Sequence, residues 1–121
     1  MDFKFDNNIP IYIQLVENLK KYIISGKIKP GDKLLSVREL ALKTKVNPNT
    51  MQKALTELED LKLIYTERTN GKYVTQDEKI INKLKDEYAK ELSCKYFQNM
   101  KDIGFDTIDS IAYLKKLGGD N

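Results

Sequence analysis

The sequence predicts a mainly α-helical protein that contains one small β-hairpin. Apolar residues recur every three to four positions over most of the 121 residues, as they do on one face of an α-helix. After Leu63 this period gives way to two short β-prone runs, LIYT and KYVT, and the Asn70-Gly71 pair between them favours a tight turn. The helical period resumes at residue 77, so the predicted order is helix, short helix, helix, hairpin and two further helices.

The first helix is expected over residues 8–25. Pro10 suits a position in the first turn, where its missing N–H breaks no hydrogen bond, and Gly26 is a signal for the C-terminal cap. Between them, apolar residues spaced by 3, 4 and 4 positions share one helical face. These residues are Tyr12, Leu15, Leu19 and Ile23. Pro30-Gly31 then marks a turn.

A short second helix is expected to begin after Ser36. In the run SVRE the Ser36 side chain can accept from the backbone N–H of Glu39, and the Glu39 side chain can bond back, which is a capping box. Residues 43–46 form a brief connection to the next helix. The inward face of the second helix consists of Val37, Leu40 and Ala41.

The third helix is expected to begin with the run NPN. Asn47 is a favoured N-cap residue, and Pro48 is favoured at the first helical position. The apolar face of this helix is formed by Met51, Ala54, Leu55 and Leu58. The opposite face carries Asn49, Gln52, Lys53 and Thr56. Polar groups therefore gather at the start of this helix and along its outer face.

Composition lowers the expectation of an enzyme or a metalloprotein. The chain has no histidine and one cysteine, Cys94, so we expect no catalytic triad, no metal site, no cofactor and no disulfide. Cys94 is interpreted as a small apolar packing residue. No apolar run approaches the length of a membrane span, and the N-terminus MDFKFD has no signal-peptide pattern. We therefore expect a cytoplasmic protein without a membrane partner.

The positive charge of the chain is concentrated in one stretch. The net charge is +3, but residues 27–53 contain 7 basic and 2 acidic residues. An excess of this kind suits an anionic partner such as nucleic acid. The alternative from charge alone is an ordinary solvated surface.

Two short helices joined by a few residues and followed by a hairpin are the order of a winged helix-turn-helix. In that motif the second helix lies in the major groove of double-stranded DNA, and its N-terminal residues contact the bases. Asn49 and Thr50 offer short polar groups there, the Gln52 amide can pair with adenine, and Lys53 suits a phosphate. The alternative is that Asn47 serves only as a helix cap, with Asn49 and Gln52 as ordinary surface residues.

The central part of the chain resembles the winged-helix domain of the GntR family of bacterial transcription regulators. The resemblance is carried by the run SGKIKPGDKLLSVRELALKTKVNPNTMQKALTELEDLKLI and by NGKYV, which follows it. IPIYIQL and VNPNT resemble its YtrA-type subfamily, and the similarity covers about residues 9–75. The resemblance implies a dimeric repressor of a palindromic operator, in this subfamily often for ABC-type transporter genes. It assigns DNA contacts to Arg38 and to Asn49, Thr50 and Gln52, and the wing tip to Gly71. The full set of expected DNA-binding residues is Ser36, Arg38, Asn47, Asn49, Thr50, Gln52, Lys53, Arg68, Gly71 and Lys72.

The sequence departs from the family pattern at four positions. Leu35 stands where the family usually has proline, and Pro48 where much of the wider family has an arginine. Lys62 replaces a common glycine before the wing, and Thr69 replaces the first glycine of the wing. These departures concern the turn before Ser36, one DNA contact and the wing geometry, and not the fold.

The two arginines of the chain fall within the expected DNA-binding elements. Against 19 lysines, the chain has only Arg38, in the first helix of the motif, and Arg68, in the hairpin. The planar guanidinium fits phosphate and guanine better than an ammonium does. Their placement adds modest support for DNA binding, with chance as the alternative.

Residues 77–121 are expected to form a two-helix dimerisation segment after a DNA-binding domain at 1–76. Seven apolar residues spaced by 3.67 positions on average would form one stripe on a helix of about 25 residues, which is too long for the first domain to cover. The stripe is Ile81, Leu84, Tyr88, Leu92, Tyr96, Met100 and Ile103. A short helix at 106–117 can cover part of it, and a second copy of the chain the rest. The alternative is a monomer whose C-terminal helices fold back.

The sequence thus predicts a DNA-binding repressor that acts as a homodimer. A winged helix that binds only proteins is the first alternative, although it would not need the basic stretch. An enzyme that uses carboxylates is the second, but its acidic residues are spread along helix surfaces. About 45 residues after the first domain leave little room for a deep effector pocket, so a small-molecule effector is left open.

Overall fold

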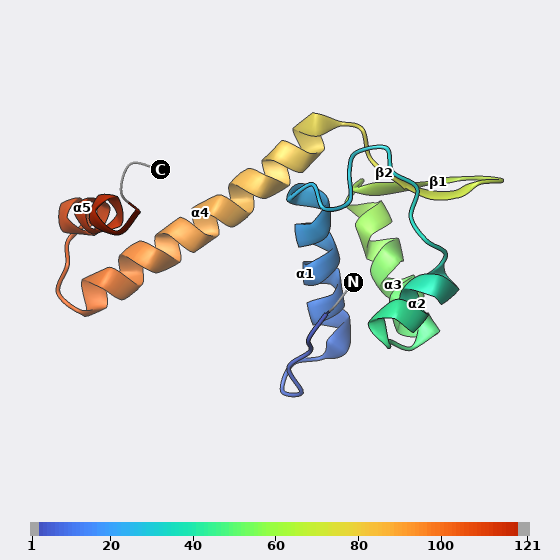
Figure 1. Ribbon diagram of the computed structural model, residues 1–121, viewed down its shortest axis with the longest axis horizontal. Helices are drawn as coiled ribbons and strands as arrows, with labels where there is room; N and C mark the ends of the chain where they lie inside the picture. The colour runs from blue at the N-terminus through green and yellow to red at the C-terminus, as the bar shows by residue number, and fades with distance from the viewer. Residues whose placement is uncertain (1–2, 119–121) are drawn as a thin grey trace. The chain divides into compact units, whose positions relative to one another are not determined.

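The computed structural model describes residues 3–118 and confirms the mainly α-helical fold with one hairpin (Figure 1). The chain divides into two compact units, residues 1–85 and residues 86–121, whereas the sequence suggested a boundary after residue 76. The elements, in order, are α1 (Ile11–Ile24), α2 (Val37–Thr44), α3 (Pro48–Asp60), β1 (Ile64–Glu67), β2 (Gly71–Val74), α4 (Glu78–Asp102) and α5 (Thr107–Gly118).

Helix α1 begins three residues later than the sequence suggested. Residues 6–9 form a turn in which the backbone N–H of Asn8 donates to Asp6 Oδ1 at 2.9 Å and that of Ile9 donates to the Asp6 carbonyl at 3.3 Å. Pro10 is the N-cap, with an extended ψ of 133°, and does not lie in the first turn. The helix ends at Ile24, and Gly26 follows with a φ of +82°.

The N-terminal unit is built around one apolar core. Helices α1 and α3 run side by side, α2 packs against α3, and the hairpin joins the end of α3 (Figure 1). The predicted inward face of α3 is buried in full, and on α2 Leu40 and Ala41 are buried while Val37 is half-buried. Ile81, from the first turn of α4, is 8% exposed and belongs to this core, with Leu84 packed against it. The core therefore extends beyond the hairpin into the start of α4.

The hairpin pairs Ile64 with Val74 and Glu67 with Gly71, so residues 68–70 form a three-residue loop. The tight turn predicted at Asn70-Gly71 is thus placed slightly too late, because Gly71 is already paired and has a φ of +106°. Residues before α2 add a short third segment, in which the Leu34 N–H donates to the Lys72 carbonyl at 2.8 Å.

Two tyrosines form a pair across the hairpin. The rings of Tyr65 and Tyr73 stack with their centroids 5.7 Å apart and an interplanar angle of 20°. Tyr65 is 39% exposed, so this pair does not bury Tyr65 between the hairpin and the helices. They lie on the opposite side of the hairpin from the buried pair Ile64 and Val74, because successive strand residues alternate between faces.

Lys62 adopts the left-handed conformation that the family's usual glycine would adopt. Its φ is +66°, its N–H donates to the Glu59 carbonyl at 2.9 Å, and the Leu63 N–H donates to the Leu58 carbonyl at 3.0 Å. This pair of bonds is the Schellman arrangement that ends a helix. The backbone path from α3 to β1 is therefore kept despite the side chain.

In the C-terminal unit, helix α5 packs on α4 through a small polar contact. Ser110 is fully buried; its hydroxyl donates to the Asp106 carbonyl at 2.7 Å, and its carbonyl accepts from the Tyr96 hydroxyl at 2.7 Å. The apolar residues of α5 do not cover α4 as the sequence suggested. Ile108, Ile111, Leu114 and Leu117 are 77%, 43%, 47% and 71% exposed.

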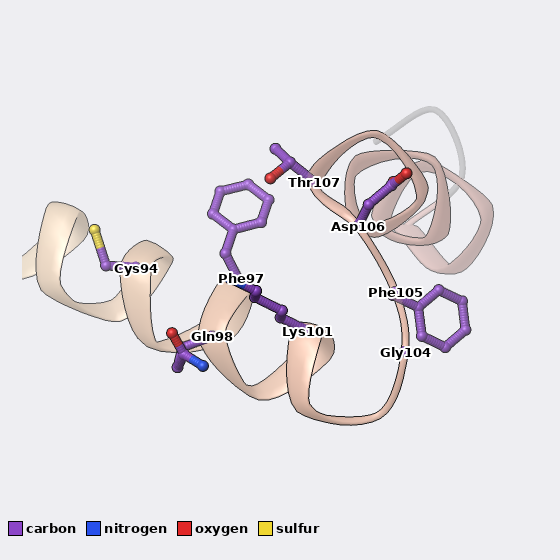
Figure 2. A pocket seen from close by; sticks show the side chains of 8 residues that line it. All are labelled: Cys94, Phe97, Gln98, Lys101, Gly104, Phe105, Asp106 and Thr107. Carbon is purple, nitrogen blue, oxygen red and sulfur yellow. The ribbon is translucent and has the colours of Figure 1, made fainter.

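An open groove of about 530 Å³ lies where α4 turns into α5. Figure 2 shows Phe97 directed from α4 toward Thr107 at the start of α5, with Cys94 further along α4. Cys94 is exposed in the single chain, so it is not a packing residue inside the C-terminal unit. Most of the lining side chains are exposed, so the groove is not an enclosed pocket. No helix among the described residues is long and apolar enough to span a membrane.

Candidate nucleic-acid interface

Helix α2 begins with the predicted capping box. The Glu39 N–H donates to Ser36 Oγ at 3.1 Å, and the Ser36 N–H donates to Glu39 Oε1 at 3.2 Å. Arg38 lies in the first turn of α2 with an exposed side chain. The Ser36 hydroxyl has a free hydrogen, because it serves the cap only as an acceptor. The start of α2 therefore presents a hydroxyl donor and a guanidinium to solvent.

Helix α3 begins at Pro48 with Asn47 as its cap, as the sequence predicted. Asn47 Oδ1 accepts from the backbone N–H of Asn49 at 2.8 Å. The Asn49 side chain is exposed and that of Thr50 is half-buried. The Asn47 oxygen is engaged by the helix, and its amide hydrogens can donate to a DNA phosphate. Asn49 and Thr50 do not cap the helix, so their side chains are the polar groups at the start of α3 that can bind DNA.

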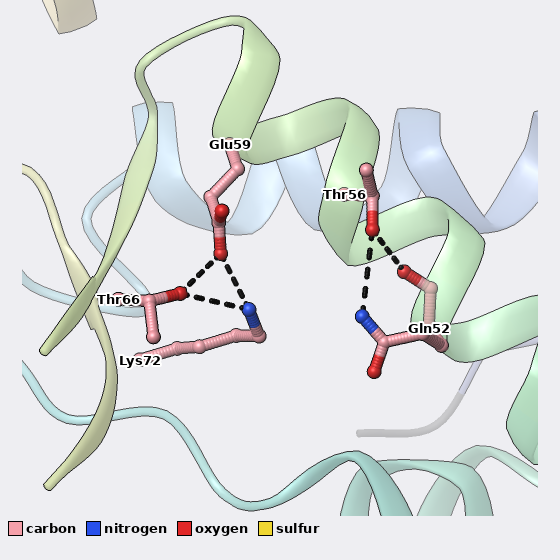
Figure 3. Close-up of polar contacts among 5 residues, drawn as sticks. All are labelled: Gln52, Thr56, Glu59, Thr66 and Lys72. Carbon is pink, nitrogen blue, oxygen red and sulfur yellow. Dashed lines mark hydrogen bonds and ion pairs between the residues drawn. The ribbon is translucent and has the colours of Figure 1, made fainter. Parts of the chain in front are cut away.

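Gln52 is exposed on the outer face of α3, one turn before Thr56 (Figure 3). The Thr56 hydroxyl donates to the Gln52 carbonyl at 2.9 Å and accepts from Gln52 Nε2 at 3.4 Å. Thr56 has a single hydroxyl hydrogen, so toward the amide it can act only as an acceptor. This arrangement leaves Oε1 and one N–H of the Gln52 amide facing outward, which is the pair of groups that adenine requires.

Lys53 lies over α1 instead of standing free in solvent. Its ammonium is 5.0 Å from the centre of the Tyr12 ring, within the range of a cation–π contact. The Tyr12 hydroxyl donates to Glu57 Oε2 at 2.6 Å, and this bond to a carboxylate raises the pKa of Tyr12. Tyr12 therefore links α1 to α3 through both residues. A phosphate contact by Lys53 would require its side chain to leave the ring.

The hairpin presents Arg68 at its tip. Arg68 is exposed in the loop between the strands, followed two residues later by Asn70, whose amide lies 3.3 Å from Glu67 Oε2. Within residues 3–118, neither Arg68 nor Arg38 forms an ion pair with a carboxylate. Both guanidinium groups are thus available to an external anion.

Lys72, in contrast, is paired with a carboxylate within the protein. Its ammonium forms an ion pair with Glu59 in the last turn of α3 and lies 2.9 Å from Thr66 Oγ1 (Figure 3). The Thr66 hydroxyl also donates to Glu59, so the three side chains form a closed triangle, and the hydrogen bond from Lys72 lowers the pKa of Glu59. The sequence predicted Lys72 as a DNA-binding residue and did not predict its pairing with Glu59, since 13 residues separate the two.

A groove of about 430 Å³ separates the start of α2 from the hairpin. Its walls are formed by residues 33–37 on one side and by Thr66 and residues 70–72 on the other. A second groove of about 430 Å³, lined in part by Arg38 and Lys45, lies between α2 and the start of α3. The two grooves therefore border the start of α2, and Arg38 lines the second of them.

The expected dimer stripe is less uniform than the sequence suggested. Ile81 is buried in the N-terminal unit, and Ile103 lies beyond the end of α4, 70% exposed. Leu92 is 65% exposed, while Tyr96 bonds to α5. Leu84, Tyr88 and Met100 are half-buried. The exposed apolar surface of the C-terminal unit therefore lies on Leu92 and Ile103 and, for the larger part, on α5.

Comparison with known proteins gives one consistent result. Residues 11–74 match the family model described as bacterial regulatory proteins, gntR family. The chain is 35% identical over 115 residues to the HTH-type transcriptional regulator YhcF of Bacillus subtilis (strain 168), covering 95% of each protein. It is 45% identical over 73 residues to the HTH-type transcriptional repressor YtrA of the same organism, which is 60% of this chain and 56% of that protein.

Solved structures agree with these matches. A GntR family transcriptional regulator from Listeria monocytogenes superposes with a TM-score of 0.84 at 45% identity, covering 93% of this chain and 98% of that one. The DNA-binding domain of AraR, solved in complex with operator ORR3, superposes with a TM-score of 0.52 at 29% identity, covering 62% of this chain and 88% of that domain.

Proposed function

The chain belongs to the gntR family of bacterial regulatory proteins and is of the YtrA type. We propose that it represses transcription by binding a palindromic operator as a homodimer. A regulator of this family binds DNA through its winged helix-turn-helix. Repression would follow from occupancy, since a dimer seated on an operator that overlaps a promoter excludes the polymerase.

The observation that carries the proposal is the exposed start of α3. Asn49 is exposed there, and Gln52 presents one acceptor and one donor outward because Thr56 holds the rest of its amide. In a helix-turn-helix these are positions that reach base edges in the major groove. The AraR domain with the same fold was solved on an operator, which supports the same use of the surface here.

Arg38, in the helix before α3, and Arg68, in the hairpin after it, support the proposal. Both are exposed, and neither is paired with a carboxylate among the described residues. Ser36 has a hydroxyl hydrogen to donate beside Arg38. Contacts of this kind position a protein on the phosphate backbone, while the bases are read by α3.

The homodimer is proposed from the apolar surface of the C-terminal unit. Ile108 and Leu117 on α5 and Leu92 on α4 are each more than 60% exposed in the single chain. Large apolar side chains that are exposed within one short segment are candidates for an interaction site. A second copy offers the same surface, and a two-fold axis would also present two copies of α3 to one operator.

The proposed target is an operon for a membrane transporter of the ABC type, as the YtrA-type resemblance suggests. Selection of binding sites from random duplex DNA, followed by footprinting, tests the proposal at each level. We expect an enriched site made of two inverted half-sites centred about one helical turn or a multiple of it apart. Failure to enrich any sequence would reject operator binding, and a single half-site would reject the dimeric mode. Enriched sites away from transporter promoters would reject the proposed target.

A further inference from the structure

The hairpin is attached to α3 at one polar point near its tip. Ile64 and Val74 are paired and buried, and they form the last fully buried rung of the hairpin. Two rungs further out, Thr66 pairs with Lys72, and only the Glu67–Gly71 rung separates them from the loop that carries Arg68. Beyond the apolar core, the position of the loop therefore depends on what holds the Thr66–Lys72 rung.

The Leu34 N–H binds the backbone of this rung, through the Lys72 carbonyl, and Glu59 in the last turn of α3 binds its side chains. Glu59 Oε1 accepts from the Thr66 hydroxyl and from the Lys72 ammonium, and Lys72 also donates to Thr66 Oγ1 at 2.9 Å. One carboxylate thus binds both strands at the same level (Figure 3). The Lys72 and Glu59 side chains are only 20% and 33% exposed, so water screens this pair less than a pair on the open surface.

We propose that Glu59 is a positioning residue for DNA binding, which fixes the hairpin and its Arg68 relative to the recognition helix through Thr66 and Lys72. This inference rests on the proposed DNA-binding function. It gives Lys72 a role that differs from a phosphate contact, because its charge is directed to Glu59. Arg68, which has no carboxylate partner among residues 3–118, is then the hairpin cation that meets the phosphate backbone.

A double-mutant cycle on the full chain separates the two roles of Lys72. Glu59→Gln, Lys72→Gln and the double variant are measured for affinity to the selected operator at several salt concentrations. If Lys72 acts through Glu59, each single change weakens binding on the order of 3- to 10-fold, and the double variant is no weaker than either single variant. Lys72→Gln should then leave the salt slope of log K close to that of the parent.

Asp60→Asn is the matched control, since it removes the same charge from the next residue, which is exposed and outside the triangle. Hydroxyl-radical footprints report the hairpin directly. In Glu59→Gln we expect weaker protection of the DNA backbone that the hairpin contacts, and unchanged protection of the DNA backbone around α3. Circular dichroism must show that each variant is folded. A second substitution, Thr66→Val, keeps both charges and removes the two contacts of the triangle that the Thr66 hydroxyl makes.

The outcomes distinguish this inference from the proposed function. A parent protein that enriches no duplex rejects DNA binding itself. If the parent binds DNA, two results together would reject the positioning role: additive effects of Glu59→Gln and Lys72→Gln, and a salt slope of log K lowered by about 0.9 in Lys72→Gln. They would show that Lys72 contacts a phosphate. An intact hairpin footprint in Glu59→Gln and Thr66→Val, or an equal loss in Asp60→Asn, rejects it as well.

Discussion

Asn47 Oδ1 accepts a hydrogen bond of 2.8 Å from the backbone N–H of Asn49, so the first side chain at the tip of the recognition helix is bound to the helix itself. Substitution by alanine removes this acceptor and leaves a backbone N–H without its partner. We expect Asn47→Ala to lower the free energy of unfolding by about 1 kcal/mol, while Asn47→Asp, which keeps the acceptor, stays near the parent. Urea denaturation measures both, and an unchanged midpoint in Asn47→Ala would show that the cap does not stabilise the protein.

Arg38 should contribute to binding of any duplex. Its side chain is exposed at the start of α2, and it has no carboxylate partner among residues 3–118. Arg38→Ala should weaken binding of operator and random DNA alike by about 1–3 kcal/mol, for the loss of one charge-assisted contact. Lys90→Ala, an exposed position on α4, is the control for net charge. Equal affinities of Arg38→Ala and Lys90→Ala at one salt concentration would remove Arg38 from the interface.

Gln52 should determine sequence preference more than affinity, because base contacts specify and phosphate contacts position. Repeating the random-duplex selection with Gln52→Ala should give a consensus that is relaxed at one position in each half-site. Thr56→Val should relax the same position less, since it only frees the amide that Thr56 orients. The same consensus in Gln52→Ala and in the parent would exclude Gln52 from base readout.

Local sequence signals predicted the parts of this surface that depend on neighbouring residues. The capping box at Ser36 and Glu39 and the Asn47 cap each involve residues within three positions, so their geometry follows from the short sequence alone. The buried face of α3 follows from helical spacing in the same way. The helix-turn-helix is predictable from the sequence because it consists of such elements.

Contacts between distant residues were missed because no spacing rule brings them together. The Glu59–Lys72 pair requires the hairpin register to place residue 72 beside the end of α3, and the contact of Lys53 with Tyr12 requires the packing of α1 on α3. The exposure of Cys94 likewise depends on how α5 lies on α4. Lys53 and Lys72 were therefore predicted only as DNA-binding residues, although both have intramolecular partners in the folded chain.

Lys62 is a position where glycine should stabilise the protein. A side chain in the left-handed region is strained by contact with its own carbonyl, and the φ of Lys62 is +66°. Lys62→Gly relieves this strain but also loosens the unfolded chain, so we expect a net gain of roughly 0.5–1 kcal/mol. Lys62→Ala, which keeps a Cβ, should show no such gain. The urea midpoints of the parent and both variants, measured at one protein concentration, give the change in stability. A lower midpoint for Lys62→Gly would contradict the prediction that Lys62 is strained.

Shortened chains test the boundary between DNA binding and dimerisation. A chain that ends at Gln76, as the sequence alone suggests, would lose Ile81, which is 8% exposed in the core of the N-terminal unit, and Leu84 beside it. A chain that ends at Lys85 keeps both residues. Residues 1–85 should therefore fold as a monomer, whereas the full chain should form a homodimer at micromolar concentration.

Two substitutions on α5 test the same dimer without truncation. Ile111 and Leu114 are 43% and 47% exposed in the single chain, so charged side chains there can reach water without disturbing its fold. Ile111→Glu with Leu114→Glu should give a folded monomer, because four carboxylates would face one another across a two-fold axis. Operator affinity should fall roughly 100-fold or more, since two half-sites are then bound independently. Sedimentation equilibrium decides between the alternatives: a monomeric parent would reject the dimer and the palindromic operator together, and a dimeric double variant would place the interface away from α5.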